Sequence, residues 1–77
     1  MDLTPVKERI EREQMKGDIK EACRRAGVEE SVYRYAMGQK TTKDLRPREI
    51  KVVYAMIGIL DERAGMIEKI ESQCSAN

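Results

Sequence analysis

The chain contains no histidine, no tryptophan and no phenylalanine, and its only cysteines are Cys23 and Cys74. Without imidazole groups, general-base catalysis by histidine and metal sites built on histidine are excluded. Two cysteines are too few for a disulfide framework or a zinc site, so we expect two free thiols in a reducing cytoplasm. No apolar run approaches the roughly 18 residues of a membrane span, so we expect neither a membrane segment nor a signal peptide.

The sequence also lacks the side-chain patterns of an active site. It has no glycine-rich phosphate loop, no Ser or Cys nucleophile beside a base, and no carboxylates at metal-binding spacing. The acidic pairs Glu29–Glu30 and Asp61–Glu62 are adjacent in sequence, and adjacent residues of a helix point to different sides. We therefore expect no enzymatic activity, no metal, no cofactor and no small-molecule substrate.

The chain is rich in charges of both signs. Its 77 residues are 40% hydrophobic and 38% charged, which is typical of one small globular domain. Fifteen Lys and Arg residues against fourteen Asp and Glu residues give a net charge of +1, which excludes a uniformly basic or acidic tail. The basic excess is local, because residues 16–51 carry ten basic and six acidic groups.

Helix signals run along the whole chain, and the alternation of β-branched residues that is typical of strands is missing. Thr4 is a good N-cap with a proline after it, so the first helix is predicted to begin there and to end by Gly17. The second helix is predicted to begin at Asp18, with Glu21 placed for a capping box, and to end at Gly27.

Two further helices are predicted after this glycine. One runs from about Glu29 to Met37 or Gln39, and a polar, basic connector follows it. The last helix begins at Pro47 and continues to about Ser72. It is longer than a compact domain of this size needs.

The last helix carries apolar stripes along its whole length. One stripe has the spacing of a coiled-coil seam and comprises Ile50, Val53, Ile57, Leu60, Ala64 and Ile67. A second stripe is interrupted by Arg63 and comprises Val52, Met56, Ile59, Met66 and Ile70. We predict that residues 1–60 form the domain and that residues 61–77 form a dimerisation element with a frayed end, through Leu60, Ala64, Ile67 and Ile70, with Met66 beside them.

An alternative to the dimer is a monomer. In that arrangement the second half of the last helix folds back along the first helix and covers Val6 and Ile10. A small core without large aromatic side chains leaves only about 3–5 kcal/mol of net stability, which favours a partner.

A linked set of residue types lies in the stretch GDIKEACRRAGVEESVYRYAM. The small residue Cys23 stands four positions before Gly27, and the apolar residues Val28, Tyr33 and Ala36 follow that glycine. This set resembles the helix-turn-helix of phage repressors of the Cro and lambda-repressor type, over about 21 of the 77 residues. In that family a small residue is needed where the two helices cross, and a glycine makes the turn between them.

The resemblance implies an all-α fold, a small helical helix-turn-helix domain with its motif at about residues 18–38 and a long C-terminal helix. It implies that the helix at residues 29–38 enters the major groove of double-stranded DNA. The residues that would face the bases are Glu30, Ser31, Arg34 and Tyr35, of which Arg34 suits guanine. The candidates for phosphate contacts are Lys16, Lys20, Lys40, Thr42 and Lys43.

The expected function is therefore that of a small cytoplasmic, sequence-dependent DNA-binding protein. The resemblance implies a transcriptional regulator of phage or mobile-element type that binds as a homodimer, with half-sites about one helical turn or ~34 Å apart. Glu29 and Glu30 argue against DNA binding, because phosphates repel carboxylates. Three explanations stay open: the two acids read cytosines, they stabilise the helix N-terminus, or they belong to a surface that binds protein. The alternatives are a protein–protein interaction module, an adaptor or inhibitor that docks through its apolar last helix, and a homo-oligomeric structural accessory.

Overall fold

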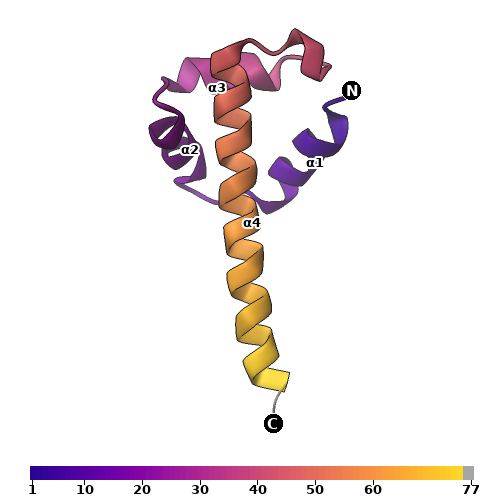
Figure 1. The fold of residues 1–77 in the computed structure, drawn as a ribbon, viewed down its shortest axis with the longest axis vertical. Helices are drawn as coiled ribbons and strands as arrows, with labels where there is room; N and C mark the ends of the chain where they lie inside the picture. The colour runs from indigo at the N-terminus through magenta and orange to yellow at the C-terminus, as the bar shows by residue number, and fades with distance from the viewer. Residues whose placement is uncertain (76–77) are drawn as a thin grey trace.

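The computed structural model describes residues 1–75, and these fold into four α-helices and one short 3-10 helix (Figure 1). The elements are α1 (Thr4–Glu13), α2 (Asp18–Ala26), α3 (Glu30–Met37), η1 (Thr42–Asp44) and α4 (Pro47–Ser75). No strand forms within residues 1–75, where the one isolated bridge joins Asp2 to Thr41. The predicted all-α class and the long last helix are confirmed, and none of the described helices has the length and apolarity to cross a membrane.

Helix α4 is the axis of the molecule (Figure 1). Its first half lies against α1, α2 and α3, with α1 and α2 on opposite sides and α3 crossing near its N-terminal end. Its second half extends beyond the other helices, which makes the molecule 48 Å long and only 17 Å thick. We call residues 1–63 the head and residues 64–75 the projecting segment.

The apolar core lies between α4 and the three short helices. Helix α4 contributes a continuous buried face, made of Val52, Val53, Met56, Ile59 and Leu60. The short helices contribute Ile10, Ala22, Cys23, Tyr33 and Ala36. Cys23, Tyr33 and Ala36 are therefore buried, as predicted from their places around the turn glycine.

A nearly buried ion pair closes the head at the end that is distant from α3. Arg63 donates to both carboxylate oxygens of Asp18, at 2.6 and 3.0 Å, and also to the carbonyl oxygen of Glu13, at 3.3 Å. The backbone N–H of Met15 donates to Asp18 as well, at 2.7 Å. The Arg63 guanidinium, and then the Met15 amide, hold the pKa of Asp18 below its usual value. One side chain of α4 thus joins the end of α1 to the start of α2.

Helix α1 begins at Thr4 as predicted, but its N-cap and its end differ from the prediction. The N-cap residue is Leu3, not Thr4, and the preceding Asp2 accepts at Oδ1 hydrogen bonds from the Thr4 N–H and hydroxyl, at 2.8 and 2.7 Å. The backbone is already helical at Leu3, with φ −85° and ψ −5°. The helix ends at Glu13, well before the glycine that was expected to end it, because Gln14 is extended with ψ 147°.

Helix α2 begins at Asp18 as predicted, but the capping box does not form. No side chain of its N-cap residue, Gly17, can cap the helix, and Gly17 itself has a left-handed φ of +93°. The carboxylate of Glu21 instead pairs with Arg24 and Arg25, at 2.6 and 2.9 Å. These two guanidinium groups lower the pKa of Glu21 to about 2.

The predicted role of Leu60 in dimerisation is wrong. Its side chain is only 1% exposed and packs inside the head of its own chain. The head also extends to Arg63, so the uncovered part of α4 starts at Ala64 rather than at residue 61. Helix α4 remains regular to Ser75, so fraying at residues 73–75 is not observed, and residues 76 and 77 lie outside the described residues.

The fold-back alternative is not formed either. Helix α1 packs against the first half of α4 within its own chain, and Ile10 is buried there. The projecting segment leaves the head and covers none of α1 (Figure 1). Its side chains at Ala64, Met66, Ile67 and Ile70 are exposed, as the prediction of a dimerisation element requires.

Candidate nucleic-acid interface

Helices α2 and α3 are joined by a tight turn over residues 27–29. Gly27 adopts the left-handed conformation, φ +69° and ψ 36°, which favours glycine because it has no Cβ. The Val28 N–H donates to the carbonyl oxygen of Cys23 at 3.0 Å, which closes the turn on the end of α2. The buried Cys23 lies under this turn, and burial raises the pKa of its thiol. The turn places the first residue of α3 directly against the end of α2.

Helix α3 has a buried face and an exposed face. Tyr33 and Ala36 point into the core, and the Tyr33 hydroxyl donates to Gln14 Oε1 at 3.4 Å. Ser31, Arg34 and Tyr35 are exposed, and their spacing places them together on one side of the helix. Tyr35 is 70% exposed. The residues proposed to face DNA bases thus form one solvent-facing stripe, which we call the α3 stripe.

The start of α4 brings further cations beside α3. Arg48 and Lys51 line one hollow together with Arg24 of α2 and with Glu29 and Ser31 of the turn and α3. A second hollow, lined by Val32, Tyr35, Arg46 and Arg48 with their neighbours, lies between α3 and the first turn of α4. Sequence reasoning missed these four cations, Arg24, Arg46, Arg48 and Lys51, because only the fold places the start of α4 beside both α2 and α3.

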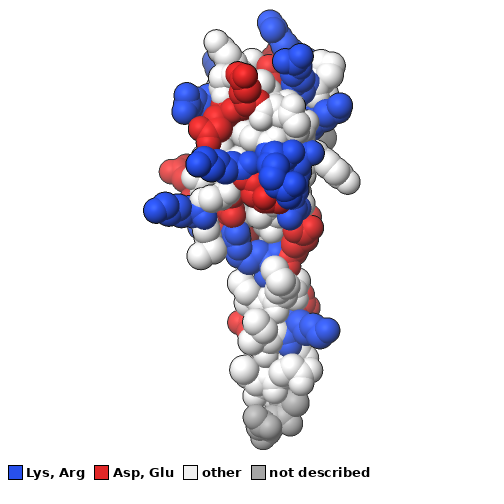
Figure 2. Space-filling view, turned by 90° about the vertical axis from the view of Figure 1, so that its left-hand side faces the viewer, with Lys and Arg blue, Asp and Glu red and all other residues white. Residues whose placement is uncertain are grey.

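Many of these cations have no acidic partner. Every ion pair within residues 1–75 uses arginine, and no lysine of that range takes part in one. In the same part of the chain, Arg46, Arg48 and Lys51 form no ion pair. Figure 2 shows Lys and Arg side chains gathered on the head with acidic side chains among them, whereas the projecting segment carries few charges. Positive charge therefore remains available to an external anion on the head.

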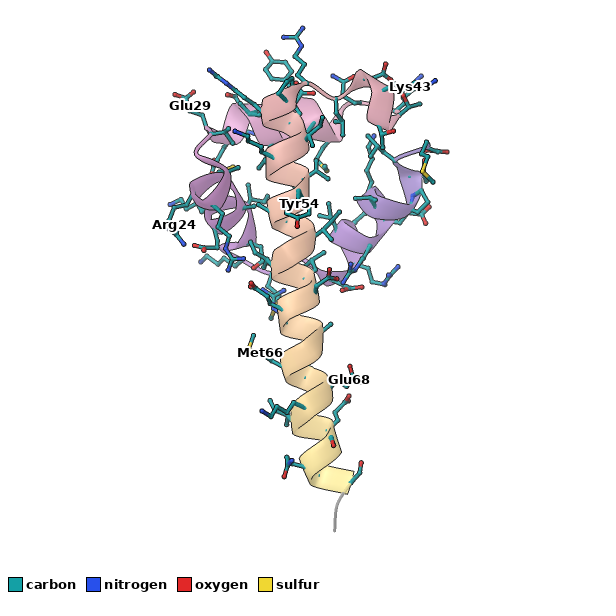
Figure 3. All side chains as sticks on the ribbon, viewed as in Figure 1. Arg24, Glu29, Lys43, Tyr54, Met66 and Glu68 are labelled. Atoms are coloured by element: carbon teal, nitrogen blue, oxygen red, sulfur yellow. The ribbon has the colours of Figure 1, made fainter. Side chains whose placement is uncertain are left out.

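The two acids at the start of α3 are placed differently. Glu29 is exposed at the corner between α2 and α3, and in Figure 3 it points away from α4. Glu30 lies beside Arg34, with 3.8 Å between Oε2 and Nη2. Both side chains are exposed, and an ion pair of this kind contributes little stability. Arg34 is therefore free to exchange this contact for a stronger one.

The predicted phosphate-binding residues fall into two groups. Lys40, Thr42 and Lys43 lie together after α3, where the start of the chain holds the connector: the Leu3 N–H donates to the Lys40 carbonyl at 2.9 Å, and the Thr42 N–H donates to the Met1 carbonyl at 2.8 Å. In Figure 3, Lys43 and Arg24 lie on opposite sides of α4. The α3 stripe is thus flanked by cations at both of its ends.

Lys16 and Lys20 form the other group. They lie at the start of α2, near the pair that Asp18 makes with Arg63. Arg63 is about 24 Å along α4 from Pro47, at about 1.5 Å per residue, whereas α3 lies beside the first turn of α4. The structure does not bring these two lysines to the α3 stripe.

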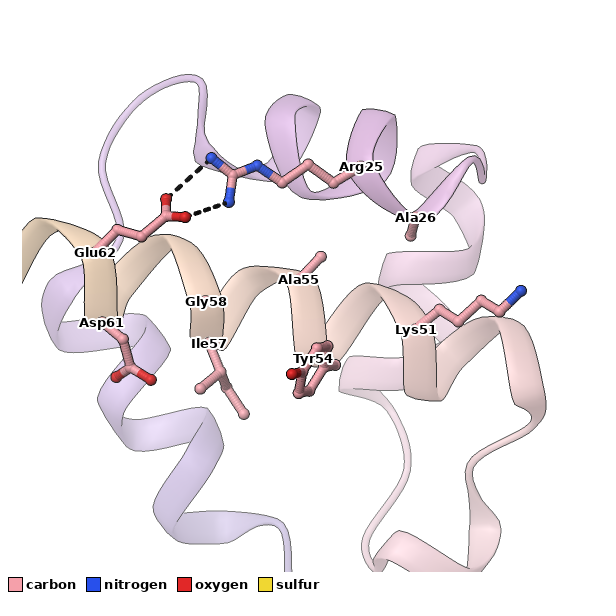
Figure 4. Close-up of a pocket in the computed structure, with 9 residues that line it drawn as sticks. All are labelled: Arg25, Ala26, Lys51, Tyr54, Ala55, Ile57, Gly58, Asp61 and Glu62. Atoms are coloured by element: carbon pink, nitrogen blue, oxygen red, sulfur yellow. Dashed lines mark hydrogen bonds and ion pairs between the residues drawn. The ribbon is translucent and has the colours of Figure 1, made fainter.

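A second candidate surface is the outer side of α4. Tyr54 is 78% exposed and Ile50 is 51% exposed, although both belong to a helix whose other side is the core. A groove between α2 and α4 runs past Tyr54 and Gly58 and is bounded by the ion pair of Arg25 with Glu62, at 3.0 Å (Figure 4). A Cβ at Gly58 would meet no atom within 4 Å, so the groove is open at this glycine.

Residues 1–75 contain no candidate metal site, since no group of three or more Cys, Asp and Glu side chains in this range is placed to hold a metal ion. All buried side-chain nitrogen and oxygen atoms in this range have hydrogen-bond partners. No protein-family model, curated protein or solved structure matches the chain. The interpretation of the candidate surfaces therefore depends on their geometry and charge.

Proposed function

We propose that the protein binds double-stranded DNA in a sequence-dependent way, as a transcriptional regulator that reads the major groove with α3. The observation that carries this proposal is the exposed α3 stripe with unpaired cations on either side of it. An α-helix fits the B-DNA major groove, and the phosphates that border the groove require positive charge beside the reading helix.

The side chains of the stripe suit particular base edges. Arg34 offers a bidentate fork to the O6 and N7 atoms of guanine, and Ser31 can donate to a base or a phosphate. Tyr35 provides an apolar ring for a thymine methyl group, and Glu30 can accept from the amino group of cytosine. With this assignment, the charge of Glu30 does not weaken DNA binding where the residue faces a C·G pair, and it weakens binding where the residue faces any other base pair.

The flanking cations suit the phosphate backbone. On one side of the stripe these are Arg46, Arg48 and Lys51, with Arg24, which is paired with Glu21, beside them; at its other end they are Lys40 and Lys43, with the Thr42 hydroxyl. Contacts of this kind fix the position of the protein on the duplex and carry no sequence information of their own. Lys16 and Lys20, at the start of α2, are assigned to phosphates beyond the reading helix.

We further propose that the protein acts as a homodimer through the projecting segment. Met66 and Ile70 are about 60% exposed and Ile67 is 48% exposed, in a segment that extends beyond the other described helices (Figure 1). Two free cysteines are consistent with a reducing compartment, so we place the dimer in the cytoplasm.

The proposal is tested by selecting bound sequences from a random duplex pool at low and moderate salt. We expect an enriched sequence motif among the bound duplexes. We also expect the logarithm of the binding constant to fall linearly with the logarithm of the salt concentration, with a slope of about −0.9 per phosphate contact. Arg34→Ala should abolish the enrichment while weak binding persists, and Arg48→Ala should weaken binding to all sequences and lower the slope by about one contact. Lys69→Ala, on the projecting segment, is the matched control and should change neither.

Two results would overturn the proposal. Absence of binding at low salt would show that Glu29 and Glu30 prevail over the cations beside them. Enrichment that survives Arg34→Ala would show that α3 does not read the bases.

A second function is favoured by the open groove beside Tyr54. A solvent-exposed tyrosine with Ile50 on the same helix is typical of a surface that docks another protein, an adaptor or inhibitor function. Such docking should change little with salt and should be lost in Tyr54→Ala, a variant that should bind DNA as the wild type does.

A further inference from the structure

The buried face of α4 continues into the projecting segment past one charged residue, Arg63, which donates to Asp18 within the head. Its positions repeat alternately at steps of three and four, through Val53, Met56, Leu60, Arg63, Ile67, Ile70 and Cys74. The first four of these face the head, whereas Ile67, Ile70 and Cys74 are exposed. A straight helix drifts only about 20° per heptad from this repeat, so all seven side chains lie on nearly the same side. The uncovered part of the stripe therefore points to the side of α4 on which the head lies.

The underside of the head exposes one large apolar side chain, that of Met15, where this stripe leaves it, with Arg12, Glu13 and Arg63 nearby. Met15, in the connection between α1 and α2, is 60% exposed. It lines a hollow together with Gln14, Ala64 and Ile67. Further along the helix, Met66 and Ile70 border a second shallow hollow. Exposed apolar side chains thus follow one another from Met15 on the underside of the head through Ile67 to Ile70 on the projecting segment.

We propose that this surface is covered by the projecting segment of a second copy of the chain, packed antiparallel. The inference rests on the dimer proposed above and adds its orientation. A parallel pair is excluded by the head itself. In a parallel pair, residues 47–63 of the partner would lie on the side of α4 that α1, α2 and α3 already fill.

An antiparallel pair avoids this overlap. The partner's helix then runs toward the underside of the head and ends there, while its own head lies beyond the C-terminal end of the first helix. With the two-fold axis between residues 68 and 69, Ile67 packs on the partner's Ile70, and the last turn of the partner's helix reaches the hollow beside Met15. The exposed apolar side chains of both copies are buried by the same contact.

The charges of the projecting segment allow this register. Glu71 is the one charged residue among the four positions that flank the stripe, which are Ala64, Met66, Glu71 and Gln73. In the antiparallel register Glu71 faces the partner's Ala64 and not the partner's Glu71, so like charges do not meet. Glu68 lies on the other side of the helix from Met66, as Figure 3 shows, away from the contact.

The size of the contact sets its strength. With the two-fold axis between residues 68 and 69, the two projecting segments overlap over residues 64–73, about 15 Å of helix at about 1.5 Å per residue. Such an interface lies at the low end of specific protein contacts, so we expect a dimer that dissociates on dilution.

This orientation also sets the spacing of the reading helices. Helix α3 lies near residue 49 of α4, so the two α3 helices stand roughly 60 Å apart along the common axis, at about 1.5 Å per residue. That is nearer to two turns of B-DNA than to the single turn of ~34 Å expected for a compact dimer.

The experiment combines sedimentation equilibrium with disulfide trapping. In a Cys74→Ser background, Ala64→Cys and Glu71→Cys chains are prepared separately, mixed and oxidised with copper phenanthroline. We expect the mixture to form a covalent dimer at least about fivefold more than either chain alone, because an antiparallel pair places these positions on the same flank. The native Cys74 thiols should not cross-link, since the two lie about 16 Å apart along the axis. The buried Cys23 thiol is present in every sample and serves as an internal control.

Each outcome separates the proposals. Efficient cross-linking of native Cys74 would show a parallel dimer, which overturns the orientation and keeps the dimer. A dimer by sedimentation that gives neither cross-link would place the interface elsewhere and overturn the inference. A monomer at all concentrations up to about 1 mM, where even weak pairs associate, would overturn both the dimer and its orientation. Binding to the duplex pool, measured on the same samples, tests the DNA proposal independently.

Discussion

The burial of Leu60 separates two readings of α4 that the sequence alone leaves open. If Leu60 belongs to the head, Leu60→Ala destabilises the monomer; if it belongs to a dimer seam, the same change dissociates the dimer and leaves the fold intact. The side chain is 1% exposed and packs in the core cluster with its neighbours Met56 and Ile59. We therefore expect the first outcome.

The magnitude follows from the size of the side chain and of the domain. Replacing a buried leucine by alanine costs about 3 kcal/mol, through lost transfer free energy and the cavity left behind. A domain of this length has about 3–5 kcal/mol of net stability, so most of it would be lost. One kcal/mol corresponds to about 4–8 °C in Tm for a domain of 60–100 residues, so Tm should fall by about 12–24 °C.

The assay is thermal unfolding followed by circular dichroism at 222 nm, at a concentration low enough for the protein to be monomeric. Ile67→Ala is the matched control: it also shortens an aliphatic side chain of the same stripe, but one that is 48% exposed beyond the head. Its Tm in the monomer should change by less than about 3 °C, consistent with a surface substitution. A fall of that small size in Leu60→Ala, together with loss of the dimer, would refute the placement of Leu60 in the core.

Two further predictions concern titrating groups. The Arg63 guanidinium holds the pKa of Asp18 in the folded protein below its unfolded value of about 3.9. The ion pair therefore stabilises the fold fully above about pH 4, and this stabilisation is lost as the pH falls through the folded-state pKa. The difference in urea midpoint between wild type and Asp18→Asn should therefore be largest at neutral pH and narrow below about pH 4; a constant difference would contradict the role of the carboxylate charge. The exposed Cys74 thiol should react quickly with Ellman's reagent, whereas Cys23, buried with a raised pKa, should react only after unfolding; two fast equivalents would show that the turn over Cys23 opens readily.

Local patterns in the sequence predicted the elements well where one residue type determines the backbone. Gly27 requires a left-handed turn, and the apolar spacing around it predicted both the bounds of α3 and the burial of Cys23, Tyr33 and Ala36. The start of α4 at Pro47 was predicted for a similar reason, because proline suits the first turn of a helix.

Relations between distant segments were predicted less well. The periodicity of α4 shows which side is apolar but not what covers it, which explains the wrong assignment of Leu60 to a dimer. Arg48 and Lys51 were overlooked beside α3, because their proximity depends on how α4 crosses the head. The capping box at Glu21 did not form because Gly17, not Asp18, is the N-cap residue, and the Glu21 carboxylate pairs with Arg24 and Arg25 instead.

Helix α4 runs without interruption from the α3 contact to the exposed end of the projecting segment. The number of residues between these two ends therefore sets both their distance and their relative rotation about the helix axis. Inserting one residue after Ala64 would turn everything beyond it by about 100° and advance it by about 1.5 Å, whereas inserting seven would restore the phase almost completely and add about 10 Å. A series of such insertions changes the distance and the rotation between the two ends of α4 in known steps. Properties that depend on the facing of the two ends should recur with a period of about seven inserted residues, and properties of the head alone should not change along the series.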